Sequence, residues 1–236
     1  MRKLLVLVAC LAQSAAHAAA IGKPEVTVEI PDGWVEVPAS VLQDFYDELK
    51  RQMPLEKVPK YDYAFQANAG PPWLAYPYVL VRVAPTGRPT ERELEELPKV
   101  DLNEEMRKQG GDWSKILKGS SMGQMRFDKA ANIVWLSSKN DVANVGTVSG
   151  ISGMIPTEQG FIEMHGYALE ADFAQHLPTF EKIISGAKAA PHLAYQPRWS
   201  DKLGPAAGLD FKRIGFFAVI GALIAVFAGI YRRRKN

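Results

Sequence analysis

A charge-free stretch near the C-terminus constrains this 236-residue chain more than any other feature. Residues 214–231 contain no Asp, Glu, Lys or Arg, and the basic run 232–235 follows at once. A run of this length is sufficient for a helix that crosses the hydrocarbon core of a bilayer, and basic residues collect on the cytoplasmic side of such a span. We therefore expect a transmembrane helix at 214–231, a cytoplasmic tail at 232–236, and the preceding domain outside the cytoplasm.

The first 18 residues have the pattern of a secretory signal peptide. Two basic residues precede the apolar run 4–12, and Ala16-His17-Ala18 has the small-x-small pattern of a signal-peptidase site. We expect cleavage after Ala18. An alternative hypothesis is that residues 7–10, Leu-Val-Ala-Cys, form a lipobox in which Cys10 is lipidated. Cys10 is the only cysteine, so cleavage after Ala18 would leave neither disulfides nor a thiol nucleophile in the mature chain.

The net charge of +2 comes from these terminal segments. Eight of the 28 Lys and Arg residues lie at positions 2, 3, 212, 213 and 232–235, which leaves 20 basic residues against 26 acidic ones in the exported part. Such an acidic domain is a poor partner for nucleic acid. The signal, the span and the charge together indicate a single-pass protein of the bacterial inner membrane, with its N-terminal domain in the periplasm.

Residues 21–188 are enough for one hydrophobic core, and their periodicity indicates an α+β fold. We expect an antiparallel sheet of about six to seven strands packed with helices, because short turns separate successive strands. The expected strands are 26–30, 34–37, 61–68, 78–83, 124–128, 132–139, 145–154 and 160–169; the expected helices are 41–51, 91–97, 102–109 and 172–187, with an extra turn at 112–118. Residues 189–213 are rich in proline and glycine and read as a stalk.

Both ends of this region resemble PsbP-like domains, which are named after an extrinsic subunit of photosystem II. Residues 30–34 read Ile-Pro-Asp-Gly-Trp, similar to the "I-P-x-G-W" opening of those domains. Gly166-Tyr167-Ala168 ends a late hairpin, and an amphipathic helix carrying 180–185, Phe-Glu-Lys-Ile-Ile-Ser, closes the region. The resemblance covers about 25–188 and implies an antiparallel sheet covered by helices, with a role in binding or assembly. The helix at 41–51 and the C-terminal span depart from the family pattern.

The sequence carries no recognisable catalytic, metal or cofactor motif, so we expect a non-enzymatic protein without a cofactor. The strongest polar pair is Glu163 and His165, which strand alternation places on one face. They could share a proton in the cleft of an envelope hydrolase, although a catalytic dyad needs a third group that the sequence does not reveal. The alternative is a strand whose polar side chains are half solvated.

The segment 71–78, Pro-Pro-Trp-Leu-Ala-Tyr-Pro-Tyr, is the first candidate for a binding surface. Prolines leave such a loop little conformational entropy to lose on binding, and exposed Trp and Tyr dominate interface energetics. We therefore expect Trp73, Leu74, Tyr76 and Tyr78 to contact a partner, which we expect to be another envelope protein. The alternative is that the aromatic rings fill the core beside the sheet edge.

Three small residues recur every fourth position within the predicted span, Gly221, Ala225 and Gly229. This spacing lets two helix backbones approach closely in a membrane and would suit a homodimer or pairing with another span. The resulting hypothesis is a membrane-anchored binding or assembly module of the bacterial envelope. A further alternative is that the C-terminal span is a sorting signal that is cleaved.

Overall fold

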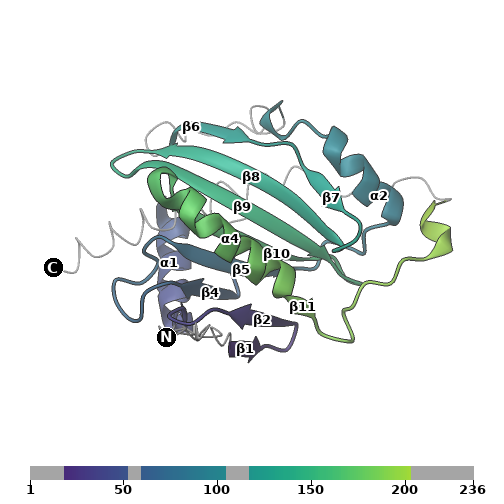
Figure 1. Ribbon diagram of the computed structural model, residues 1–236, viewed down its shortest axis with the longest axis horizontal. Helices are drawn as coiled ribbons and strands as arrows, with labels where there is room; N and C mark the ends of the chain where they lie inside the picture. Colours follow the sequence, from purple (N-terminus) through teal and green to yellow (C-terminus); the bar gives the residue numbers. More distant parts are fainter. Residues whose placement is uncertain (1–18, 53–59, 105–116, 203–236) are drawn as a thin grey trace, which may run out of the picture.

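The computed structural model describes residues 19–52, 60–104 and 117–202 (Figure 1). The predicted signal peptide with Cys10, most of the predicted helix 102–109, the membrane span with its three small residues, and the basic tail lie outside these ranges. The α+β prediction is confirmed, because the described residues form a large antiparallel sheet with a few helices.

The main sheet has eight antiparallel strands, not the six or seven that we expected, and three further strands form a separate sheet. In spatial order the main sheet contains β3 (Val35–Glu36), β4 (Tyr63–Gln66), β5 (Tyr78–Ala84), β10 (Phe161–Leu169), β9 (Gly146–Pro156), β8 (Ile133–Val142) and β6 (Leu117–Met122), with β7 (Arg126–Asp128) also paired to β8. The small sheet contains β1 (Ala19–Gly22), β2 (Val26–Ile30) and β11 (Lys188–Ala189). An extra helical turn was predicted at 112–118, but its last two residues belong to strand β6.

Helices cover both faces of the main sheet. Helix α4 (Glu170–Gly186) crosses one face, seen in front in Figure 1, and packs Phe180, Ile183 and Ile184 on apolar residues of β5, β9 and β10. Helix α1 (Ala39–Gln52) lies behind the sheet. Its apolar residues pack on Tyr78 and Tyr167 of β5 and β10. The central strand β10 is therefore buried on both sides, and eight of its nine residues are buried.

The helix near residue 91 begins where its capping residues predict. α2 (Glu91–Glu96) has a complete capping box, in which Thr90 accepts from the Glu93 amide and the Glu93 carboxylate accepts from the Thr90 amide. Pro98 then lies in the short 3-10 helix η1 (Leu97–Lys99), which ends the α-helix as predicted. α2 and η1 cover the α1 side of the sheet at the opposite end from α1, through Leu94 and Leu97.

The predicted stalk is wrong for residues 189–202, which pack on the domain. We call residues 188–202 the C-terminal strap. β11 pairs with β2, Leu193 is buried, and the Glu158 amide donates to the Leu193 carbonyl at 3.0 Å. The strap ends in the 3-10 helix η2 (Trp199–Lys202) beside α2. The domain therefore extends at least 14 residues beyond the predicted boundary at 188.

Candidate functional site

A row of polar side chains crosses the α1 side of the main sheet. Strand alternation puts Glu163 and His165 of β10 on this face, as expected. The antiparallel register sets Arg82 of β5 opposite Glu163 and Ser152 of β9 opposite His165. We call these four residues the polar row. The exposed fractions of Glu163, His165 and Ser152 are 2%, 1% and 2%.

The row is held by an ion pair at one end and a hydrogen bond at the other. Arg82 Nη1 donates to Glu163 Oε2 at 2.9 Å, and Ser152 Oγ lies 2.8 Å from His165 Nδ1. Between them, His165 Nε2 lies 3.8 Å from Glu163 Oε2 and makes no hydrogen bond within the described structure. Arg82 thus balances the buried Glu163 carboxylate, which would be costly to bury alone.

An aromatic wall closes the row on the α1 side. The edge of the Tyr61 ring meets the His165 ring at a centroid distance of 6.1 Å, and the Tyr167 ring stacks on it at 6.3 Å. Burial, and then the nearby Glu163 carboxylate, raise the pKa of Tyr61 well above its usual value, so its hydroxyl stays protonated. Tyr61 is therefore an uncharged neighbour of the row.

The row separates two apolar clusters on the same sheet face. Along β10, Phe161 belongs to the cluster under α2 and η1, and Tyr167 belongs to the cluster under α1. Glu163 and His165 occupy the two inward positions between them. Chemically, the row contains the serine, histidine and carboxylate of a hydrolytic site, but a substrate could reach it only if the covering elements moved. Ser152 and Arg82 could not be recognised from the sequence as members of the row, because their contacts depend on strand register.

The proline-aromatic loop folds around one buried amide. Gln66 Oε1 accepts from the Leu74 amide at 2.7 Å, and Gln66 Nε2 donates to the carbonyls of Asn68 and Gly70 at 2.8 and 3.0 Å. Leu74 and Tyr78 are 1% and 0% exposed and belong to the α1 core. These two residues therefore cannot contact a partner as we expected.

The other two residues of the predicted surface are half-buried. Trp73 and Tyr76 pack against the α1 core, and Tyr76 stacks on Tyr78 at a centroid distance of 5.1 Å. Burial raises the pKa of Tyr76 far above its usual value. The four side chains do not form one exposed apolar patch, and the loop serves mainly as part of the core.

An open groove of about 500 Å³, not predicted from the sequence, lies beside α4. We call it the β8 groove. Phe127, Trp135 and Ile151 line it with half-buried apolar surface, and Arg126, Ser137 and Glu181 line it with exposed polar groups. A neighbouring hollow of about 290 Å³ shares Pro98 and Gln124 with it. Its aromatic residues, Phe127 and Trp135, lie in the strands predicted at 124–128 and 132–139, but their positions in the sequence do not reveal that they line one groove.

Gly123 lines the neighbouring hollow and lies next to Ser137, a residue of the β8 groove. The Gly123 amide donates to the Ser137 carbonyl at 2.9 Å, where the chain passes from β6 to β7 along β8. A Cβ atom at this position would lie 2.3 Å from Ser137 Oγ, so the Ser137 hydroxyl would have to rotate away from it. Glycine at position 123 therefore leaves room for the orientation that the Ser137 side chain adopts.

Within the part of the chain that the structure describes, no group of three His, Cys, Asp or Glu side chains is placed to hold a metal ion. In the same residues no helix has both the length and the apolarity that a membrane crossing requires. The predicted span at 214–231 lies outside these residues.

No family model matches the sequence, and no curated protein matches it. The fold is similar to the solution structure of cyanobacterial PsbP (CyanoP) from Synechocystis sp. PCC 6803, with 13% identity, a TM-score of 0.44, and coverage of 78% of this chain and 99% of that one. It is also similar to the crystal structure of LpqN from Mycobacterium tuberculosis, a protein involved in cell envelope biogenesis, with 12% identity, a TM-score of 0.36, and coverage of 75% and 92%.

Proposed function

We propose that this protein is a membrane-anchored, extracytoplasmic binding module that captures another envelope protein in the β8 groove. The signal peptide and the span predicted from the sequence support the location. The observation that carries the binding role is the contrast between two sites: apolar side chains line an open groove, whereas the groups suited to catalysis are buried.

The groove suits a partner that inserts an apolar side chain. Trp135 and Phe127 offer aromatic surface, the type of residue that contributes most to protein interfaces. Arg126 and Glu181 bring opposite charges to the same groove, which can orient a polar backbone or side chain of the partner. An extended segment with one aromatic or aliphatic anchor matches both features.

The test is a photo-crosslinking residue at Phe127 in the full chain in cells, combined with one of two substitutions on β8. Ser137→Arg fills the groove, whereas Asp141→Arg adds the same side chain four residues along the same strand face, outside the groove. We expect Ser137→Arg to lower the yield of the crosslinked partner about tenfold or more, equivalent to about 1.4 kcal/mol.

Asp141→Arg is the matched control and should leave the crosslink intact. Circular dichroism of both variants checks that the fold is retained. A crosslink that survives Ser137→Arg would show that the groove is not the interface. An adduct of twice the chain's mass would identify the partner as a second copy of this protein.

A second candidate is an envelope hydrolase, and the polar row favours it. Ser152, His165 and Glu163 supply a hydroxyl, an imidazole and a carboxylate in one line. A fluorophosphonate probe, which labels activated serines, should leave the wild-type protein unlabelled if the protein is only a binding module. Labelling that disappears in Ser152→Ala would instead support the hydrolase, whereas a Glu163→Gln, His165→Ala variant that fully complements a deletion would remove it.

A further inference from the structure

We infer that the η2 end of the domain lies against the lipid headgroup region, with Trp199 inserted into the membrane interface. This inference rests on the proposed membrane anchor and adds an orientation and a lipid contact to it. Three observations carry it: the exposure of Trp199, the contacts that hold η2 to the domain, and the short distance along the chain to the predicted span.

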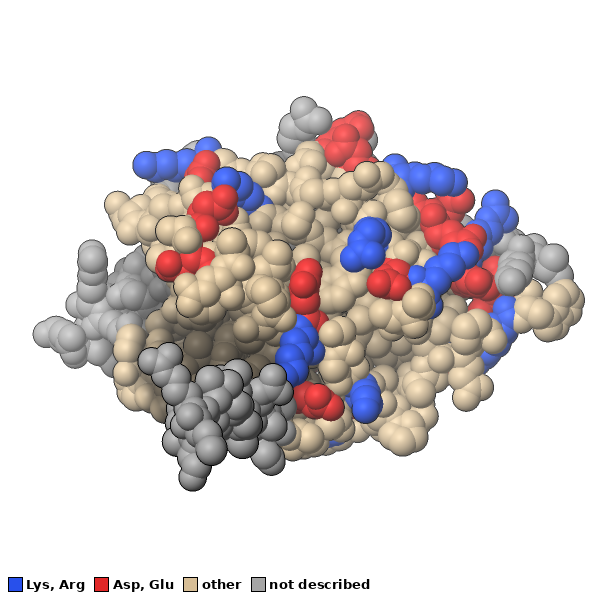
Figure 2. Space-filling view, viewed as in Figure 1, with Lys and Arg blue, Asp and Glu red and all other residues tan. Residues whose placement is uncertain are grey.

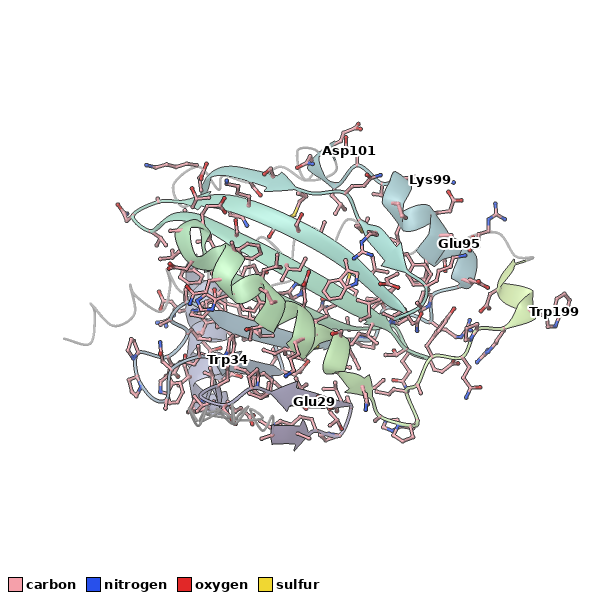
Figure 3. All side chains as sticks on the ribbon, viewed as in Figure 1. Glu29, Trp34, Glu95, Lys99, Asp101 and Trp199 are labelled. Carbon is pink, nitrogen blue, oxygen red and sulfur yellow. The ribbon has the colours of Figure 1, made fainter. Side chains whose placement is uncertain are left out.

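Trp199 is 77% exposed and is the one large hydrophobic side chain with such exposure among the described residues. Figure 3 shows it projecting away from the body of the domain at the η2 end. Tryptophan combines a large apolar ring with an N–H donor, and it concentrates where membrane meets water. Insertion into the membrane–water interface would remove the apolar surface of this ring from water, which is favourable.

An ion-pair clasp fixes η2 to the domain. Arg88 donates to both carboxylate oxygens of Asp201, at 2.9 and 2.8 Å, and to Glu158 Oε1 at 3.0 Å. It also donates to the Gln196 carbonyl at 2.6 Å and lies over the Tyr195 ring at 4.7 Å. The clasp contacts Tyr195 and Gln196 before Trp199 and Asp201 after it. The domain itself therefore sets the direction in which Trp199 points.

The predicted span begins close to the clasp. Eleven residues, 203–213, separate η2 from position 214. Even fully extended, they reach at most about 40 Å. Tethering over so short a distance gives a local concentration on the order of millimolar, so a weak contact between Trp199 and lipid is sufficient to orient the domain.

The surface around Trp199 carries both signs of charge. Figure 2 shows basic and acidic side chains intermixed at the end that carries α2 and η2. Arg198 pairs with Glu158, and Lys129 pairs with Glu95 of α2. Such a mixed surface is not suited to an anionic membrane in particular. We therefore assign the contact to the interface of a zwitterionic bilayer and expect it to depend little on salt.

The experiment uses the full chain in phosphatidylcholine vesicles that contain a nitroxide-labelled lipid, with Cys10 replaced by Ser. A fluorophore sensitive to its environment is attached at Ser200→Cys, next to Trp199, or at Gln43→Cys as the control. Both positions are exposed, and Gln43 lies on α1 at the opposite end of the domain. Flotation with the vesicles is measured in the same samples.

We expect the label at position 200 to lose intensity and shift to shorter wavelength, while the label at position 43 remains as it is in water. Trp199→Ser should remove most of the change at position 200. Equal signals at both positions in floating protein would overturn the inference but leave the anchor intact. A change at position 200 that persists in Trp199→Ser would overturn the role of Trp199. Protein that fails to float would remove the anchor and the inference together.

Discussion

Single glycines decide how closely helix α4 approaches the main sheet. A Cβ atom on Gly166 would lie 2.6 Å from the Phe180 ring, and one on Gly153 would lie 2.2 Å from Ile184 Cγ2. Both contacts are shorter than packed atoms allow, so the two glycines leave the space that the apolar face of α4 fills. The interior is close-packed, and a single added carbon is therefore felt.

Gly153→Ala should lower the free energy of unfolding by about 1–3 kcal/mol, because overpacking forces α4 or β9 to shift. Gly22→Ala on β1 is the matched control, since a Cβ there meets no atom within 4 Å. Urea unfolding followed by circular dichroism measures both. Equal stability of the two variants would show that the space next to Ile184 is not tightly filled.

The residues of the polar row show how far the sequence predicts a site. Alternation along one strand correctly placed Glu163 and His165 on one face. Their burial and their partners were not predictable, because Arg82 lies 81 residues from Glu163 along the chain and meets it only through the pairing of β5 with β10. The prediction of a binding surface at 71–78 was wrong for a related reason. The composition of this loop does not reveal that hydrogen bonds to Gln66 hold it against the core.

At the scale of elements, local signals predicted what local interactions stabilise. The capping box at Thr90 and Glu93 correctly predicted the start of α2. Alternation predicted the bounds of the four strands between 124 and 169 to within a few residues. β6 was missed because its sequence, Leu-Lys-Gly-Ser-Ser-Met, has no apolar alternation and is defined by pairing with β8. The strap was missed because an ion pair between Arg88 and Asp201, 113 residues apart, holds it.

The clasp makes the docking of the strap sensitive to acid. Hydrogen bonds from Arg88 lower the pKa of Asp201 from 3.8 to about 2 in the folded protein. A carboxyl with a lowered pKa in the folded state stabilises that state when it is ionised. Its contribution is therefore complete above about pH 4 and is lost as the pH falls towards 2.

We predict that Asp201→Asn lowers the urea midpoint relative to the wild type at pH 6, and that the two proteins converge as the pH approaches 2. The difference between them isolates Asp201 from the other carboxylates that titrate in this range. Asp172→Asn, which changes an exposed residue of α4, is the control and should track the wild type. A gap between Asp201→Asn and the wild type that stays constant with pH would contradict the role of the clasp.

At the scale of the whole molecule, the described residues form one domain with both faces of its main sheet covered. The catalytic-type groups lie inside, and the β8 groove lies on the α4 side. The clasped strap brings the chain to the η2 end (Figure 1). In our account this domain works outside the cytoplasm on a tether of eleven residues. Binding, orientation and lipid contact all depend on that placement.

The most direct test of this placement is a pair of fusions in intact cells. Alkaline phosphatase, whose disulfides form only outside the reducing cytosol, is fused after Lys202, and a reporter that is active only in the cytosol is fused after Asn236. We predict that both fusions are active. An inactive phosphatase at Lys202 would mean that the domain stays in the cytoplasm. That result would contradict the extracytoplasmic location on which the proposed binding and lipid contact depend.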